Sequence, residues 1–181
     1  MATVEGLARR VVLTGSESTG KTTLTADLAR HYDAVWVPEY VRSYAAGKGS
    51  PLDAGDVEPI ATAQIAVQDA ALLRARGLLL LDTDLLSTAV YARHYYGWCP
   101  DWVTQAVLAR RADLYLLCDI DIPWAADPQR DRPHEREQLQ GLFDEALRSR
   151  QFPVVRIRGN WQERFDAARN AIDALLGHSS P

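Results

Sequence analysis

The feature that most constrains this 181-residue chain is the stretch over residues 15–22, which has the sequence GSESTGKT. It satisfies the pattern G-x-x-x-x-G-K-[ST], follows the apolar run at residues 11–13, and precedes a stretch with leucines at i, i+4 spacing. A strand, a glycine-bearing loop and a helix in this order form the setting in which the pattern binds phosphate. An ordinary glycine turn is the alternative, and this setting argues against it.

The loop residues have separate expected roles in binding ATP. Its glycines let backbone N–H groups surround the phosphates, and the helix N-terminus adds positive potential. Lys21 is expected to reach the β- and γ-phosphates and to act in catalysis, and Thr22 to offer its hydroxyl to Mg²⁺. The residues predicted to bind ATP are Gly15, Ser18, Thr19, Gly20, Lys21, Thr22 and Thr23. Glu17 is unusual here, because its carboxylate repels phosphate unless it faces solvent or pairs with a cation.

Short apolar runs alternate with helical patterns along the chain. Strands are expected over residues 11–13, 34–37, 77–81, 114–118 and 154–157, and helices include residues 22–31, 60–76 and 100–111. This alternation predicts an α/β fold of three layers, in which a five-stranded parallel sheet lies between helices and ligands gather at the carboxyl ends of the strands. The length and the lack of a linker predict one domain over residues 1–181.

Composition narrows the class of protein. With 20 Lys and Arg against 24 Asp and Glu, the net charge of -4 does not favour a nucleic-acid partner. Two cysteines are too few for a disulfide framework or a metal site, which favours a reducing, cytoplasmic setting. The start of the chain lacks the pattern of a signal peptide, and no apolar run is long enough to cross a bilayer. A homo-oligomer is compatible with these features.

Charged residues follow two of the expected strands. Glu39 and Arg42 come after the second, where a carboxylate can take a proton from an acceptor hydroxyl and a guanidinium can hold transferring charge. A surface ion pair at a helix start is the alternative. Asp82, after the third strand, is the candidate carboxylate for Mg²⁺, with capping of the next helix as its alternative. Asp84 is the second candidate for assisting the metal or the acceptor.

Residues 124–137 are rich in proline and arginine and follow the fourth expected strand. We expect this segment to be a lid that closes over ATP and excludes water, with Arg130, Arg132 and Arg136 contacting the nucleotide. A solvated charged loop is the alternative, because nearby acidic residues can neutralise the arginines.

Several separated motifs together resemble one family. The loop at residues 13–22, the VPEYVR segment at 37–42, Gln64, the DTD at 82–84 and the DIPW at 121–124 are similar to the nicotinamide riboside kinase domain of NadR-type proteins, in the P-loop NTPase superfamily. The resemblance covers about residues 10–165. It implies phosphorylation of nicotinamide riboside to nicotinamide mononucleotide, a step of NAD salvage, with ATP and Mg²⁺ as cofactors.

The resemblance also implies site residues. The acceptor is expected to contact Glu39, Arg42, Gln64, Asp84 and Trp124, and Glu39 matches the general base of the related deoxynucleoside kinases. One departure affects the lid: the family usually has Asp-Gly before its arginine, whereas this chain has Asp-Pro-Gln before Arg130. The DNA-binding and adenylyltransferase functions of longer family members are not transferred.

Aromatic residues near these motifs suggest a pocket that selects a cationic pyridinium ring through cation–π attraction. The candidates are Trp36, Tyr95, Tyr96, Trp98, Trp102 and Trp124. Packing in the core is the alternative for the four residues between 95 and 102. Two other functions remain as alternatives: a kinase for another nucleoside or small metabolite, and a regulatory ATPase without a small-molecule acceptor.

Overall fold

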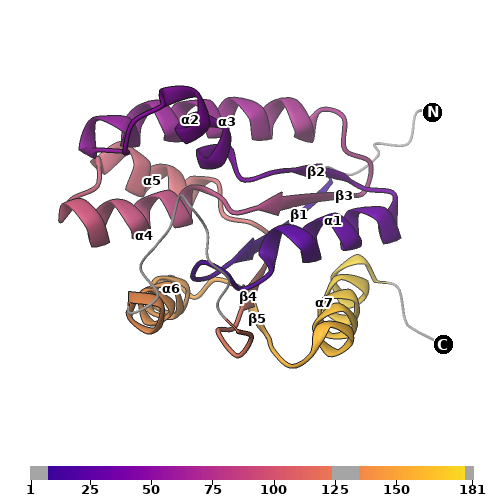
Figure 1. Cartoon of the computed structure of the whole chain (residues 1–181). Coiled ribbons are helices and arrows are strands. Elements are labelled where there is room, and N and C mark those ends of the chain that lie inside the picture. The colour runs from indigo at the N-terminus through magenta and orange to yellow at the C-terminus, as the bar shows by residue number, and fades with distance from the viewer. Residues whose placement is uncertain (1–7, 124–134, 178–181) are drawn as a thin grey trace.

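Five parallel strands form one sheet in the computed structural model, which describes residues 8–123 and 135–177 (Figure 1). They are β1 (Arg9–Thr14), β2 (Val35–Val37), β3 (Leu78–Asp82), β4 (Leu114–Cys118) and β5 (Val154–Ile157). Their order is β2-β3-β1-β4-β5, so β1 is central and the chain crosses to its other side between β3 and β4. The carboxyl end of β1 therefore lies at a topological switch point, where open parallel sheets bind ligands.

Helices cover both faces of the sheet. They are α1 (Lys21–Tyr32), α2 (Tyr40–Lys48), α3 (Val57–Leu72), α4 (Leu85–Tyr96), α5 (Asp101–Ala109), α6 (Arg136–Ser149) and α7 (Trp161–Leu176), with a 3-10 turn η1 (Ala54–Asp56) before α3. One face packs against α1 and α7, and the other against α3, α4, α5 and α6 (Figure 1). The predicted α/β fold of three layers is confirmed.

The strands alternate between two hydrophobic clusters. Val11 and Leu13 of β1 belong to the cluster that includes α1 and α7, whereas Val12 between them belongs to the other. In β3 every residue is buried, which explains why its first four residues are all leucine rather than alternating apolar and polar residues. Burial on both faces holds the carboxyl ends of β1 and β3 side by side, with Leu13 paired to Asp82.

The bounds of α3 differ most from the sequence-based prediction, whereas those of α1 and α5 differ by one or two residues. Helix α3 begins at Val57 rather than residue 60, because Asp53 and Asp56 form a capping box that starts the chain turning one 3-10 turn earlier. It ends at Leu72 rather than residue 76, and Gly77 then takes a left-handed conformation with φ of 76°. The chain reverses over these residues to enter β3.

Within residues 8–123 and 135–177, no helix is both long and apolar enough to span a membrane. The extent of a single domain, residues 1–181, stays a prediction.

Candidate active site

The loop between β1 and α1 curves through three residues in or near the left-handed region. Gly15 has φ of 120°, and a Cβ atom on it would lie 2.7 Å from the carbonyl oxygen of Cys118, so only glycine fits there. Gly20 has φ of 78° and Ser18 has φ of 53°. Gly20 is also the N-cap of α1 and has no side chain to cap the helix. The first N–H groups of α1 are therefore left to bind an anion.

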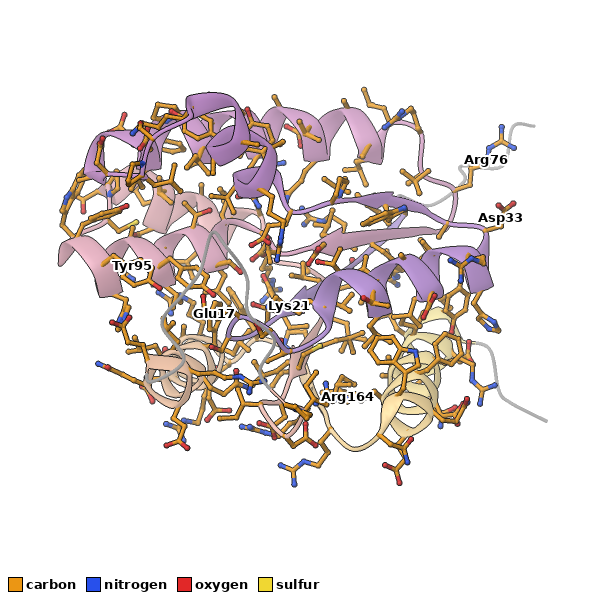
Figure 2. All side chains as sticks on the ribbon, viewed as in Figure 1. Glu17, Lys21, Asp33, Arg76, Tyr95 and Arg164 are labelled. Atoms are coloured by element: carbon orange, nitrogen blue, oxygen red, sulfur yellow. The ribbon has the colours of Figure 1, made fainter. Side chains whose placement is uncertain are left out.

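Lys21 lies at the start of α1, beside this loop (Figure 2). Its side chain is buried, and Nζ donates to the Ser16 carbonyl oxygen at 2.6 Å and lies 3.3 Å from Thr19 Oγ1. The Thr19 hydroxyl in turn donates to the same Ser16 carbonyl at 2.8 Å. The ammonium is thus held within the concave loop, where phosphates of a nucleotide would bind.

Glu17 is buried, with only 1% of its surface exposed, so the expectation that it faces solvent is wrong. The other alternative, a nearby cation, fits the structure. The Glu17 charge raises the pKa of Arg136, which opposes the larger effects of burial and of the Arg164 charge that lower it. The net pKa of Arg136 is lowered.

Thr22 and Asp82 meet at the carboxyl end of β3. Thr22 Oγ1 donates to Asp82 Oδ2 at 2.6 Å, and the other oxygen of this buried carboxylate, Oδ1, has no hydrogen-bond partner among the described residues. Burial raises the pKa of Asp82, while the hydrogen bond from Thr22 and the charge of Lys21 oppose the rise. A threonine hydroxyl beside an unsatisfied carboxylate oxygen is a donor set that suits Mg²⁺.

Asp84, two residues later, has both of its carboxylate oxygens bonded to groups within the protein. Its Oδ1 accepts from Leu86 N at 3.0 Å as the N-cap of α4, and its Oδ2 accepts from the Tyr115 hydroxyl at 3.1 Å. Complete burial raises its pKa to about 6. Thr83, between the two aspartates, has the left-handed φ of 69°, an unusual conformation for a β-branched residue. The helix is therefore capped by Asp84 and not by Asp82, for which capping was the alternative. Both oxygens of Asp84 are already bonded, so this geometry does not support the predicted contact of Asp84 with the acceptor.

We expect Asp84→Ala to lower the free energy of unfolding by about 2–4 kcal/mol, because it removes an N-cap and leaves the buried Tyr115 hydroxyl without its acceptor. Asp84→Asn keeps an acceptor oxygen and should be much milder. Urea unfolding of both variants measures the difference. A large increase in the KM of the acceptor for a stable Asp84→Asn protein would show that Asp84 contacts substrate instead.

Glu39 precedes α2 at its N-cap position and is almost fully buried. Its Oε2 accepts from Arg42 Nε at 2.8 Å, and the Arg42 side chain is 45% exposed. The pair is therefore not the surface ion pair considered as the alternative, since its carboxylate lies inside the protein. Val37 pairs with Leu81, so Glu39 follows the strand beside the one that ends at Asp82. The charges of both Glu39 and Arg42 act on the pKa of Asp82.

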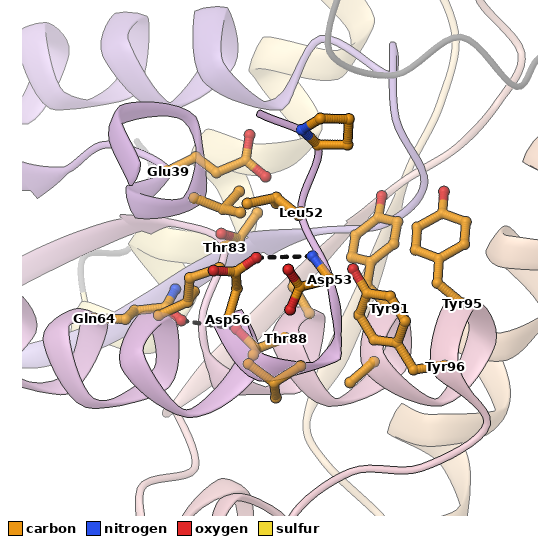
Figure 3. A pocket seen from close by; sticks show the side chains of 16 residues that line it. Glu39, Leu52, Asp53, Asp56, Gln64, Thr83, Thr88, Tyr91, Tyr95 and Tyr96 are labelled. Atoms are coloured by element: carbon orange, nitrogen blue, oxygen red, sulfur yellow. Dashed lines mark hydrogen bonds between the residues drawn. The ribbon is translucent and has the colours of Figure 1, made fainter. Parts of the chain in front are cut away.

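Glu39 lines a cavity of about 380 Å³ between α2, α3 and α4 (Figure 3). The lining residues are Glu39, Val41, Pro51, Leu52, Asp53, Asp56, Val57, Ile60, Gln64, Thr83, Ser87, Thr88, Tyr91, Ala92, Tyr95 and Tyr96. Gln64 is buried, and its Oε1 accepts from the Thr88 hydroxyl at 3.0 Å. The volume and the mixture of apolar, aromatic and acidic groups suit a small polar molecule.

Sequence reasoning missed one wall of this cavity. Lys48 Nζ bonds the carboxylates of both Asp53 and Asp56, and the Tyr44 hydroxyl donates to Asp56 Oδ1 at 2.8 Å. The acidic pair with i, i+3 spacing is a capping signature that could have located η1. Nothing local in the sequence indicates that η1 turns toward the cavity.

The residues predicted for the lid and for the aromatic pocket lie in several different places. Trp124, Arg130, Arg132 and most of the expected lid lie outside the described residues. Arg136 begins α6, where its guanidinium is bonded to backbone carbonyl groups. Of the aromatic candidates, Tyr95 and Tyr96 line the cavity, Trp98 is exposed, and Trp36 and Trp102 pack against the two core clusters.

Comparisons with known proteins agree with this geometry. The family model of the AAA domain, AAA_28, matches residues 10–164. The chain is 29% identical to the trifunctional NAD biosynthesis/regulator protein NadR of Escherichia coli K12 and 27% identical to that of Salmonella typhimurium LT2, over 176 residues in each case. Each alignment covers 93% of this chain but 43% of the relative, so the chain spans less than half of their length.

Solved structures share the fold. A NadR protein in complex with NR matches with a TM-score of 0.80 at 24% identity, covering 97% of this chain and 53% of that one. A NadR protein in complex with NAD and AMP-PNP matches at 0.76 and 25%, covering 97% and 51%. Deoxyadenosine kinase from M. mycoides with bound dATP matches at 0.63 and 14%, covering 91% and 99%.

The strand, phosphate loop and helix around Lys21 occur in a fold shared with nucleoside kinases, and the family model spans most of the chain. The chain therefore belongs to the AAA domain family of P-loop proteins and is a homologue of NadR proteins.

Proposed function

We propose that the protein is an ATP-dependent kinase that phosphorylates nicotinamide riboside to nicotinamide mononucleotide. The observation that carries this proposal is the position of Glu39, which lines the small-molecule cavity while its charge acts on Asp82, the carboxylate bonded to Thr22 of the phosphate loop. A nucleoside in the cavity and a triphosphate on the loop would therefore meet at Glu39.

In this proposal the phosphate loop binds ATP through its N–H groups and Lys21. Thr22 and Asp82 would hold Mg²⁺, which supplies positive charge at the β- and γ-phosphates when bound. Lys21 Nζ, already directed into the loop, binds the γ-phosphoryl oxygens, on which negative charge is rearranged during transfer. Arg42, bonded to Glu39, orients that carboxylate and adds positive charge.

Glu39 is assigned as the general base. The acceptor's primary hydroxyl oxygen forms a bond to the γ-phosphorus as the bond from that phosphorus to the β–γ bridging oxygen breaks, which releases ADP. The hydroxyl proton passes to the Glu39 carboxylate, so charge and atoms balance. Burial of Glu39 keeps bulk water from competing with the acceptor.

A cationic acceptor is favoured by the chemistry of the cavity walls. Three carboxylates, those of Glu39, Asp53 and Asp56, line the cavity along with Tyr91, Tyr95 and Tyr96 (Figure 3). Tyrosine faces attract a pyridinium ring. Among the described residues the three carboxylates are paired with two cations, Arg42 and Lys48, so the negative charge that these cations do not balance also attracts the ring. Nicotinamide riboside carries such a ring, and NR is the ligand of one NadR structure with the same fold.

We expect kcat/KM for nicotinamide riboside to exceed that for its reduced, uncharged form by about two- to thirtyfold, the equivalent of 0.5–2 kcal/mol of cation–π attraction. The two molecules have nearly the same shape, so the comparison isolates the charge. Steady-state kinetics with both acceptors measures the ratio. Equal values would contradict a cavity selective for cations.

The assay that tests the function uses the purified chain, ATP and Mg²⁺, with nicotinamide riboside and a panel of ordinary nucleosides. ADP release should depend on nicotinamide riboside and coincide with formation of the mononucleotide. A faster reaction with another nucleoside would show that this nucleoside is the acceptor, while the assignment as a kinase would stand. ATP hydrolysis that no nucleoside changes would support the regulatory ATPase instead.

A further inference from the structure

The phosphate loop is bonded on its outer side to the chain that leaves β4. The first connection is Gln140 of α6, whose Oε1 accepts from Ser16 N at 2.9 Å and whose Nε2 donates to the Cys118 carbonyl oxygen at 3.1 Å. Gln140 is buried, and a Cβ atom on Gly15 would lie 3.2 Å from its Oε1. One amide side chain thus joins the start of the loop to the end of β4.

Arg136, at the start of the same helix, makes the second connection. Its Nη2 donates to the Ser18 carbonyl oxygen at 2.9 Å, and its Nη1 donates to the Ile122 carbonyl oxygen at 3.0 Å. Only 8% of the residue is exposed. The guanidinium is therefore committed to the backbone in this conformation, although the sequence suggested a direct contact with ATP.

Arg164 of α7 makes the third connection and is fully buried (Figure 2). Its Nη1 donates to the Thr19 carbonyl oxygen at 3.2 Å, and its Nη2 donates to the Asp119 carbonyl oxygen at 3.0 Å. Its Nε also donates to Gly159 O at 2.9 Å, and its guanidinium pairs with the Asp121 carboxylate. Like the other two, this side chain joins one loop residue to the segment over residues 118–122.

These bonds bear on how the loop receives phosphate. In a planar trans peptide the C=O and N–H groups point in opposite directions. The Ser18 carbonyl shares its peptide with Thr19 N–H, and the Thr19 carbonyl shares its peptide with Gly20 N–H. Holding both carbonyls outward on arginines therefore turns both N–H groups to the opposite side, as an anion-binding nest requires.

Charged groups surround these connections. Arg136 and Arg164 repel each other, and the Arg164 charge lowers the pKa of Arg136 after the larger effect of burial. The carboxylates of Glu17 and Asp121 act in the opposite direction without cancelling these effects, so the net pKa of Arg136 is lowered. Asp121 also pairs directly with Arg164.

The geometry points to Gln140, Arg136 and Arg164, here called the loop clamp, as positioning residues that hold the phosphate loop in its binding conformation before a nucleotide arrives, with Asp121 as the counter-charge paired with Arg164. This inference rests on the proposed nucleotide site but not on the identity of the acceptor. The clamp residues are hydrogen-bonded to the backbone of the loop, so they affect the affinity for phosphate indirectly, by fixing the conformation of the loop.

Binding measurements without acceptor test the clamp. Arg136→Gln should raise the Kd of ATP-Mg²⁺ by about tenfold or more, the effect of losing bonds from a charged donor. Inorganic tripolyphosphate, which has no base or ribose, should lose affinity in parallel. Arg150→Gln is the matched control, because Arg150 also donates to a backbone carbonyl, that of Ala146, but at the other end of α6. Its Kd should change by less than about twofold.

Two conservative variants test the clamp if Arg136→Gln folds poorly. Arg136→Lys keeps the charge but lacks the planar fork that reaches two carbonyls, so its loss of affinity should be intermediate. Arg164→Lys should behave in the same way.

The results separate this inference from the proposed function. Wild-type protein that fails to bind ATP contradicts the proposed kinase. The clamp inference alone is overturned if the wild-type protein binds ATP and the folded Arg136→Gln and Arg164→Lys proteins bind ATP and tripolyphosphate as tightly as the wild type.

Discussion

Replacing Lys21 with alanine should lower kcat for phosphoryl transfer by about 10²–10³ or more, the loss seen when one preorganised donor to a transition state is removed. The Lys21 ammonium lies inside the phosphate loop, 2.6 Å from the Ser16 carbonyl oxygen. The other lysine of the chain, Lys48, cannot replace it, because it pairs with Asp53 and Asp56. Lys21→Arg should also fail, since a planar guanidinium does not fit the space of a compact ammonium.

Single-turnover transfer from ATP to nicotinamide riboside measures this loss, and circular dichroism checks that the variants are folded. Arg30→Ala is the control, because Arg30 lies on the same helix and forms an exposed pair with Asp27. A folded Lys21→Ala protein with wild-type kcat would contradict the assignment of Lys21.

Replacing Glu39 with glutamine should lower kcat by about 10²–10⁴ with a smaller effect on KM, because the amide cannot take the acceptor's proton. The amide oxygen can still accept the hydrogen bond from Arg42 Nε, so the local structure should be retained. Steady-state kinetics at saturating ATP separates kcat from KM for the acceptor.

Glu58→Gln provides the matched control for Glu39→Gln, since Glu58 is an exposed glutamate in the first turn of α3. It should leave both kinetic parameters unchanged. If Glu39→Gln instead raised KM and kept kcat, Glu39 would be a binding residue and the proton would have to pass to another group.

Local patterns in the sequence correctly predicted the elements and their alternation. The glycines and Lys21 are close in sequence, and their loop depends on short-range backbone geometry, so a contiguous motif was sufficient to locate it. The five apolar runs predicted the parallel sheet, most clearly at β3 and β4, because a strand buried on both faces has few polar residues. The meeting of Thr22 and Asp82 fits the rule that ligand sites gather at this edge of the sheet, since Asp82 ends β3 and the loop that leads to Thr22 leaves the neighbouring strand β1.

Finer assignments depended on which way a side chain turns. Asp82 and Asp84 are equivalent in sequence, yet one reaches Thr22 and the other caps α4, with the left-handed Thr83 between them. Glu17 was expected to face solvent or a cation, and burial decided for the cation. Such choices follow from the packing of neighbouring elements, which a local pattern does not contain.

The sequence by itself therefore determined the phosphate loop and the succession of strands and helices along the chain, and it predicted the edge of the sheet at which a ligand is expected. Only the tertiary structure decided that η1 and α4 supply walls of the cavity and that Arg164, far along the chain, bonds the Thr19 carbonyl. The physical reason is the range of the interactions. Backbone conformation and amphipathic spacing act between near neighbours, whereas the cavity and the loop clamp consist of contacts that form only when the helices pack on the sheet.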